Sequence, residues 1–225
     1  MARGKAPTYI EQRTSILVTA ARLFAQNGFH NASMSQLAAD CGMSKALLYH
    51  YYRDKEQILF DIVDTYMDRL LALVQEGAAL ELPPKEKLAE VIKRFMAEYE
   101  HSQDQHMVVV QDLKFMRKDA FEHVVEKERK VVAAFADVIA EVEPSFIKKK
   151  LSKPVTMVLF GMINWTFTWL RANGTLTYAD MADLVTDIFL HGISGAAALK
   201  SAAKPEKPAP SSKTASGAPP KRKKS

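Results

Sequence analysis

Four hydrogen-bond donors lie within a short stretch near the N-terminus: Lys45, Tyr49, His50 and Arg53. Side chains of these types hold DNA phosphates and reach the edges of bases. Leu48 and Tyr52, four residues apart, are expected to face a small core and to leave the donors outside. The alternative is an ordinary solvated helix hairpin, but the aromatic and basic run over residues 49–55 argues against it. The pattern therefore favours binding to double-stranded DNA.

Local signals predict the elements that carry these donors. Ser33, with Gln36 three residues later, has the pattern of a capping box that begins a helix. Gly42 ends that helix in a tight turn, and Ser44 caps a second, short helix. Asp54 caps a third, in which apolar residues recur at helical spacing. Two helices joined by a short turn with Gly are typical of the helix-turn-helix, which places its second helix in a major groove.

Residues 11–60 resemble the DNA-binding domain of the tetracycline-repressor (TetR) family of bacterial regulators. The residues that carry the resemblance are Ala21, Leu23-Phe24, Gly28-Phe29, Ser33, Leu37-Ala38, Gly42, Ser44-Lys45, Leu48-Tyr49-His50-Tyr51-Tyr52 and Lys55-Glu56. The resemblance implies that Lys45, Tyr49 and His50 face the groove and that Lys55 meets a phosphate.

The chain departs from the family pattern at two places. Ala46-Leu47 stands where the family often has Gly-Thr, and Arg53-Asp54 stands where it often has Pro-Ser. Leu47 is therefore a candidate contact for a thymine methyl group, and Arg53 for a further phosphate. The complete predicted DNA-binding set is Ser33, Gln36, Ser44, Lys45, Ala46, Leu47, Tyr49, His50, Arg53 and Lys55.

The charge is distributed unevenly along the chain. The formal net charge of +5 divides into +3 for residues 1–60, −4 for residues 61–200 and +6 for residues 201–225. A basic N-terminal unit on an acidic body suits a protein that presents one end to DNA. Cys41 is the single cysteine, so no disulfide forms within one chain, which fits the reducing cytoplasm. No signal peptide is evident and residues 155–170 are too short and polar to span a bilayer, so we expect a cytoplasmic protein without membrane contact.

Few glycines and many helix formers predict an all-α fold. The expected domains are a flexible arm over residues 1–10, a helix-turn-helix domain over 11–57, a ligand-binding and dimerisation domain over 58–199 and a disordered basic tail over 200–225. The third helix of the motif is expected to continue to about Gln75 and so to belong to both halves. Residues 105–116 include Met107 and three valines, which favour a strand by propensity, although the helical setting favours a short buried helix.

Two late helices are predicted to complete the body. Residues 154–171 are apolar on every side and are expected to be buried all round, and Thr177 with Asp180 begins the last helix. The resemblance to TetR regulators implies a homodimer through these two helices, and a dimer with two equivalent reading heads requires a palindromic operator.

The effector site is less clearly marked in the sequence. Asn164 lies among apolar residues on a late helix, and its polar group needs a partner from a neighbouring helix or from a ligand. Residues 161–174 resemble acyl-CoA-responsive TetR relatives, which implies an apolar tunnel with basic residues at its mouth. The predicted ligand-binding residues are Tyr66, Phe95, Tyr99, Phe115, Asn164, Trp165 and Trp169, with Arg94, Arg117 or Lys114 for the phosphates.

Other functions have weaker support. The sequence contains no phosphate loop, zinc-ligand spacing or nucleophile motif, so we expect no enzyme, metal or cofactor. His101, Asp104 and His106 are interpreted as polar surface rather than as metal ligands. Two alternatives stay open: a regulator of an efflux pump that responds to a drug-like ligand, and, in a different class, a small-molecule-binding helical protein or enzyme.

Overall fold

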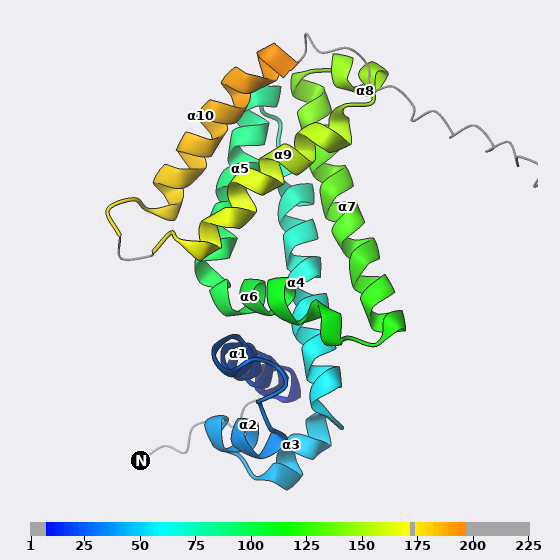
Figure 1. The fold of residues 1–225 in the computed structure, drawn as a ribbon, viewed down its shortest axis with the longest axis vertical. Helices are drawn as coiled ribbons and strands as arrows, with labels where there is room; N and C mark the ends of the chain where they lie inside the picture. Colours follow the sequence, from blue (N-terminus) through cyan, green and yellow to red (C-terminus); the bar gives the residue numbers. More distant parts are fainter. Residues whose placement is uncertain (1–7, 172–173, 197–225) are drawn as a thin grey trace, which may run out of the picture.

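A computed structural model describes residues 8–171 and 174–196. The described residues form helices and no strand, which confirms the predicted all-α fold. The elements are α1 Tyr9–Asn27, α2 Met34–Asp40, α3 Lys45–Tyr51, α4 Lys55–Ala78, α5 Pro84–His101, α6 Gln103–Asp112, η1 Leu113–Phe115, α7 Lys118–Val142, α8 Ser145–Lys149, α9 Ser152–Asn164, η2 Trp165–Thr168 and α10 Tyr178–Ala196. Helices α1–α3 form a small lower unit, and the remaining helices form a larger bundle above it (Figure 1).

Side-chain caps define the lower unit. Helix α1 begins at Tyr9, two residues before the predicted start, because Thr8 and Glu11 form a reciprocal capping box. The last residues of the predicted arm are therefore helical, whereas residues 1–7 lie outside the described residues. Gly28 ends α1 with φ near +77°, and the rings of Phe24 and Phe29 meet edge to face at 5.3 Å across this turn.

Helix α4 connects the two units. It runs from the motif into the centre of the upper bundle, where it packs against α5 and α7 (Figure 1). Gly77 permits a close approach to α5, because a Cβ atom there would lie 2.6 Å from Val91 Cγ2. Because α4 is one continuous helix, a displacement of its upper end also moves its DNA-binding end.

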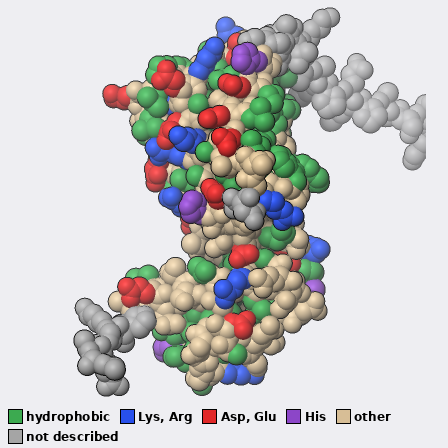
Figure 2. All heavy atoms as spheres, turned by 90° about the vertical axis from the view of Figure 1, so that its left-hand side faces the viewer, with side chains coloured by type: hydrophobic (Ala, Val, Ile, Leu, Met, Phe, Trp, Pro, Cys, Tyr) green, Lys and Arg blue, Asp and Glu red, His purple; other side chains and the backbone are tan. Residues whose placement is uncertain are grey.

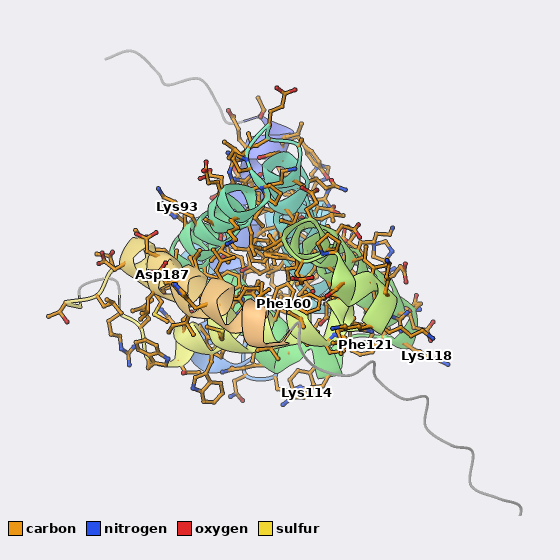
Figure 3. The ribbon with its side chains drawn as sticks, turned by 90° about the horizontal axis from the view of Figure 1, so that it is seen from above. Lys93, Lys114, Lys118, Phe121, Phe160 and Asp187 are labelled. Atoms are coloured by element: carbon orange, nitrogen blue, oxygen red, sulfur yellow. The ribbon has the colours of Figure 1, made fainter. Side chains whose placement is uncertain are left out.

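Helix α6 lies across the boundary between the units. It runs transversely above α1 and packs against both α1 and α4 (Figure 1). The ambiguous valine run is helical here, with Val108 buried. Above α6, Phe160 of α9 lies in the middle of the bundle, whereas Lys93, Lys118 and Asp187 lie on its periphery (Figure 3).

The prediction that residues 154–171 are buried all round was wrong for the single chain. The α-helix ends at Asn164 and continues as the 3₁₀ turn η2. Val158 is 62% exposed, Trp165 is 66% exposed and, on α10, Ile188 is 54% exposed. Apolar side chains gather along one edge of the upper unit, while charged ones spread over its centre (Figure 2). The cause is an apolar surface on α9 and α10 that none of the described helices covers.

Two further predictions concern the basic tail and contact with membranes. The basic tail over residues 200–225 lies outside the described residues. Among the residues that are described, no helix is both long and apolar enough to cross a membrane.

Candidate DNA-binding surface and effector cavity

Helix α3 presents the predicted donors on one face. Leu48 and Tyr52 are buried in the lower core, as their spacing predicts. On the opposite side, the exposed residues of α3 are Lys45, Ala46, Leu47, Tyr49 and His50. Leu47 and Tyr49 are exposed by 44% and 46%, so this face also presents apolar and aromatic surface. The Lys45 ammonium lies 5.9 Å from the centre of the Tyr49 ring, so charge and aromatic surface lie together on this face.

The predicted serines act first as helix caps. Ser33 Oγ accepts from the Gln36 N–H at 3.2 Å, and Ser44 Oγ accepts from the Leu47 N–H at 3.1 Å. The structure contains only this half of the predicted capping box, since no return bond joins the Gln36 side chain to Ser33. Gln36 is instead exposed beside α3.

Arg13 and Tyr52 tie α1, α3 and α4 together. Arg13 Nε donates to the Tyr52 hydroxyl at 3.0 Å, and the same guanidinium donates to Asp61 of α4. Burial raises the pKa of Tyr52 to about 12, so its hydroxyl is protonated at neutral pH. These bonds hold α1 and α4 around the C-terminal end of α3 and so determine its orientation.

Lys55 is placed differently from its predicted role. Its Nζ donates to the carbonyl oxygens of Phe29, His30 and Ala32 at 2.9–3.3 Å. Three acceptors match the three donors of an ammonium group. In this structure Lys55 therefore secures the turn between α1 and α2, and a phosphate would have to replace one of these carbonyls.

Arg53 fits a phosphate contact better. Its side chain is 73% exposed, and only Nε is engaged, with the Asp54 carboxylate at 2.8 Å. The terminal nitrogens of its guanidinium group have no partner among the described residues. Tyr9 adds an aromatic surface nearby, stacked on Tyr51 at 4.9 Å. This pair was not predicted, because the sequence analysis assigned Tyr9 to a flexible arm.

Comparison with known proteins agrees with this geometry. Residues 16–62 match the model of "Bacterial regulatory proteins, tetR family", and residues 81–193 match "Tetracyclin repressor-like, C-terminal domain". The chain belongs to the TetR family. It is a TetR-type transcriptional repressor with a helix-turn-helix DNA-binding domain.

Three relatives illustrate the similarity. A TetR-family regulator from Bordetella parapertussis is 31% identical, with a TM-score of 0.77, over 83% of this chain and 98% of that one. The fatty acid metabolism regulator protein of Bacillus subtilis is 23% identical, over 85% of this chain and 98% of its own. A structure of AibR in complex with isovaleryl coenzyme A and operator DNA has a TM-score of 0.69 at 24% identity, over 79% of this chain and 97% of that one.

The C-terminal domain of this TetR protein contains a mostly apolar cavity of about 310 Å³. Helices α4, α5, α6, α7 and α9 all contribute to its wall. The lining residues are Met67, Leu70, Phe95, Tyr99, His106, Val109, Val110, Leu113, Val124, Glu128, Val131, Val132, Met157, Phe160 and Asn164. The volume is at the lower end of the range for small-molecule sites.

A second hollow, a cleft, adjoins this cavity and reaches the DNA-binding unit. We call it the seam cleft; it is lined by residues 28–31 of the turn after α1, by residues 109–115 and by Phe121. Val109, Val110 and Leu113 line both the cavity and the seam cleft. Lys114, a predicted phosphate-binding residue, also lines the cleft.

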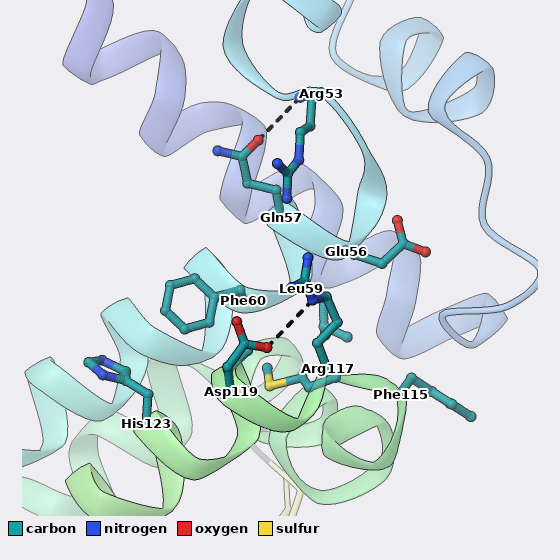
Figure 4. Close-up of a pocket in the computed structure, with 11 residues that line it drawn as sticks. Arg53, Glu56, Gln57, Leu59, Phe60, Phe115, Arg117, Asp119 and His123 are labelled. Carbon is teal, nitrogen blue, oxygen red and sulfur yellow. Dashed lines mark hydrogen bonds and ion pairs between the residues drawn. The ribbon is translucent and has the colours of Figure 1, made fainter.

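A second pocket, of about 400 Å³, adjoins the seam cleft at Phe115. We call it the interdomain pocket, because its walls come from the start of α4 and the start of α7. The guanidinium groups of Arg53 and Arg117 point into it from opposite sides (Figure 4). Arg117 Nε lies 3.5 Å from Asp119, and its terminal nitrogens have no partner among the described residues.

The structure brings together only part of the predicted ligand-binding set. Phe95, Tyr99 and Asn164 line the cavity, and the Tyr99 hydroxyl donates to Asn164 Oδ1 at 2.6 Å. Tyr66 reaches the cavity only through His106, since its hydroxyl lies 3.3 Å from His106 Nδ1.

Other members of that set lie elsewhere. Trp165 and Trp169 are largely exposed on or beside η2 and line none of the described pockets. Arg94 pairs with Glu90 and Glu76, away from the cavity, so the prediction that it meets an effector phosphate is not supported. The hydroxyl groups of Thr156 and Thr166 need no ligand, because they donate to the carbonyl oxygens of Ser152 and Ile163 one turn earlier.

His106 was misjudged as polar surface. It is 5% exposed, and burial lowers its pKa to about 4, so the ring is neutral at neutral pH. Because α6 is short and its ends are polar, the sequence did not reveal that this position faces inward. Within the described residues, no group of three or more side chains is arranged to hold a metal ion.

The far end of α6 contacts the DNA-binding unit. The rings of His30 and Phe115 meet edge to face at 4.0 Å, and Phe29 stacks on Phe115 at 5.8 Å. Asp112 is buried at this contact; burial raises the pKa of its carboxyl group, and a hydrogen bond from the Phe29 backbone opposes the shift. Helix α6 therefore connects the cavity to the turn that Lys55 secures.

Proposed function

We propose that this protein is a dimeric, ligand-responsive repressor that binds a palindromic operator and is released by an acyl-CoA of a catabolic pathway. It would act in the cytoplasm, where the DNA is. The observation that carries the effector assignment is that the apolar cavity and the seam cleft share Val109, Val110 and Leu113, and that the cationic side chain of Lys114 lines the cleft. An acyl-CoA consists of two corresponding parts, an apolar acyl group that suits the cavity and an anionic CoA carrier that suits the cleft.

The reading surface in this proposal is the exposed face of α3. Lys45, Tyr49 and His50 would reach base edges or phosphates, and Leu47 would contact a thymine methyl group. Ser33, Gln36, Ser44 and Ala46 would line the surface. The Arg53 guanidinium would turn out of the interdomain pocket to hold the DNA backbone. Lys55 would contribute mainly by keeping the turn after α1 in place.

The partner subunit would cover the apolar surface of α9 and α10. A groove of about 370 Å³ between these helices is lined entirely by apolar residues and glycine, among them Val158, Met162 and Ile188. Exposed apolar surfaces of this kind mark interfaces in soluble proteins. A two-fold contact here would place two α3 helices on one side of the dimer, as a palindrome requires.

The effector would place its acyl group in the cavity and its carrier along the seam cleft. The phosphates would then lie near Lys114 and Arg117, where charge-assisted hydrogen bonds are available. A ligand in the cleft would contact both α6 and the turn after α1. Since these surfaces touch through Phe115, Phe29 and His30, binding would favour a different angle of the DNA-binding units and a spacing that no longer fits the operator.

Two relatives support this ligand class. The Bacillus subtilis relative carries the name of a fatty acid metabolism regulator, and the AibR structure holds isovaleryl coenzyme A. The rival proposal is a drug-like or aromatic effector that controls an efflux pump, and the aromatic wall of the cavity supports it. An acyl-CoA would need the basic side chains of Lys114 and Arg117 for its phosphates, whereas a drug-like ligand would not.

A titration of the operator complex distinguishes these ligands. Footprinting on genomic fragments first identifies the operator, and protection of two symmetric half-sites is expected. CoA, free acids and a series of acyl-CoAs are then added to the complex. Release by one or more acyl-CoAs, weakened in an Arg117→Ala variant, supports the proposal. Release by a free hydrophobe but by no thioester would favour the drug-like effector, and absence of any specific DNA complex would overturn the repressor assignment.

A further inference from the structure

His106 has an unusual position on the wall of the effector cavity. Its Nε2 atom is buried and has no hydrogen-bond partner, while Nδ1 faces the Tyr66 hydroxyl at 3.3 Å. The ring lies 4.3 Å from that of Tyr99 and 5.1 Å from that of Phe167. A polar nitrogen is thus enclosed by aromatic surface at the place where a ligand would lie.

Such an arrangement is costly without a ligand. A buried polar group left without a hydrogen bond destabilises the folded state, because its hydrogen bond to water is lost and not replaced. Because the ring is neutral, one nitrogen donates and the other accepts, so Nε2 takes the role that Nδ1 does not take toward Tyr66. The neighbouring Tyr99 hydroxyl donates its proton to Asn164 at 2.6 Å, so it has no proton left to donate to Nε2.

We infer that His106 is a specificity-determining residue, whose Nε2 forms a hydrogen bond with an oxygen atom carried by the apolar part of the effector. This inference rests on the proposed function. The oxygen is either the thioester carbonyl or a hydroxyl or keto group on the acyl chain. A purely hydrocarbon ligand would leave Nε2 unpaired, and a site with a polar group rejects ligands that lack the matching atom.

The size of the cavity narrows the ligand further. About 310 Å³ corresponds to roughly ten water molecules, which sets an upper limit on the size of an acyl group enclosed by the cavity. His106 also lies on α6, whose other end contacts the DNA-binding unit. A ligand bonded to His106 would therefore act directly on the helix that joins the two units.

Calorimetry with three CoA compounds of equal chain length tests the inference. The compounds are a saturated acyl-CoA, its 3-hydroxyacyl counterpart and the S-alkyl thioether, which lacks the carbonyl. The wild type is expected to discriminate at least tenfold between two of them. Preference for the acyl-CoA over the thioether identifies the carbonyl as the bonded atom, and preference for the hydroxyacyl compound identifies the chain oxygen.

Variants then connect this discrimination to His106. His106→Phe keeps an aromatic ring but removes both nitrogens, and it should reduce the discrimination to less than threefold by weakening the oxygen-bearing ligand. His106→Leu serves the same purpose should the larger ring disturb folding. The matched control is His101→Phe on the exposed end of α5, which should leave all three affinities unchanged.

The outcomes separate the inference from the proposed function. Equal discrimination in the wild type and in both His106 variants would overturn the role of His106 and leave the acyl-CoA effector standing. Tight but non-discriminating binding by the wild type would do the same. Absence of binding by all three compounds would overturn the acyl-CoA effector, and the inference with it.

Discussion

The lower unit and the upper bundle differ in how completely their polar groups are paired. In the lower unit, Ser33 and Ser44 cap helices, Lys55 donates to three carbonyls, and Arg13 joins Tyr52 to Asp61. Among the described residues, the buried side-chain atoms without partners are His106 Nε2, Asp112 Oδ2 and Ser145 Oγ, all in the upper part. Two of them lie on α6, between the cavity and the DNA-binding unit.

This difference indicates two kinds of design. The DNA-binding unit must keep one geometry. Its polar groups are therefore hydrogen-bonded within the unit, and its exposed face is left for DNA. A ligand-responsive helix must change its surroundings, and unpaired buried atoms lower the cost of leaving its present position. The exposed apolar surface of α9 and α10 is a separate feature of the upper bundle, which a second subunit would cover. The predictions below test these assignments, beginning with the largest expected effect.

Charges on the apolar surface of α9 and α10 should have the strongest effect on operator binding. Val158→Glu combined with Ile188→Glu would bury two carboxylates per subunit in the dimer contact. Two linked DNA-binding units bind the operator roughly 10²–10⁴-fold more tightly than one, and loss of the dimer removes this gain in affinity. Sedimentation and gel shift measure both effects. Ile147→Glu, on an equally exposed residue outside the α9–α10 groove, is the control, and a double variant that remains dimeric would contradict the proposed interface.

Tyr49→Ala should weaken operator binding by roughly 100-fold, from a loss of about 1–3 kcal/mol at each of two heads. Its thermal midpoint should not change, because Tyr49 is half exposed. The neighbouring Leu48→Ala should behave in the opposite way, since that side chain is fully buried and its removal costs about 2–5 kcal/mol of stability. Equal loss of folding in both variants would show that Tyr49 is structural.

The unpaired His106 should make stability depend on pH. Its folded pKa, about 4, lies below the ordinary value of 6.5, so the unfolded chain binds the proton more readily. The contribution of the neutral His106 ring to the free energy of unfolding is therefore fully present above pH 6.5 and is lost as the pH falls toward 4. Between pH 7.5 and 5 this amounts to about 2 kcal/mol. Urea unfolding of the wild type and of His106→Phe at both pH values measures it. The same pH dependence in the two proteins would mean that another group is responsible.

Arg53 and Lys55 should separate a DNA contact from a structural one. Arg53→Ala should reduce the salt dependence of operator binding by roughly one unit per subunit, because a phosphate contact is lost. Lys55→Ala should leave that slope unchanged and lower the free energy of unfolding by about 1–2 kcal/mol, because charged hydrogen bonds to the α1–α2 turn are removed. A reduced slope for Lys55→Ala would restore the phosphate contact that the sequence predicted.

Local signals in the sequence determined most of the lower unit. The spacing of Leu48 and Tyr52 predicted the face of α3, because side chains four residues apart share one side of a helix. Ser33, Gly42 and Ser44 predicted helix ends, because caps act within a few residues of the backbone groups they satisfy. The start of α1 was missed only because the capping box of Thr8 and Glu11 was overlooked.

Tertiary structure decided what the upper bundle does with its polar and apolar groups. Helical periodicity could not show that His106 faces a cavity, that Arg94 is held by Glu90 and Glu76, or that α9 leaves Val158 exposed. Each depends on which of several distant helices lies opposite, and that choice is made by the packing of the whole bundle. The sequence determined the DNA-reading helix because its signals are local, whereas only the assembled helices created the cavity, the seam and the unpaired nitrogen between them.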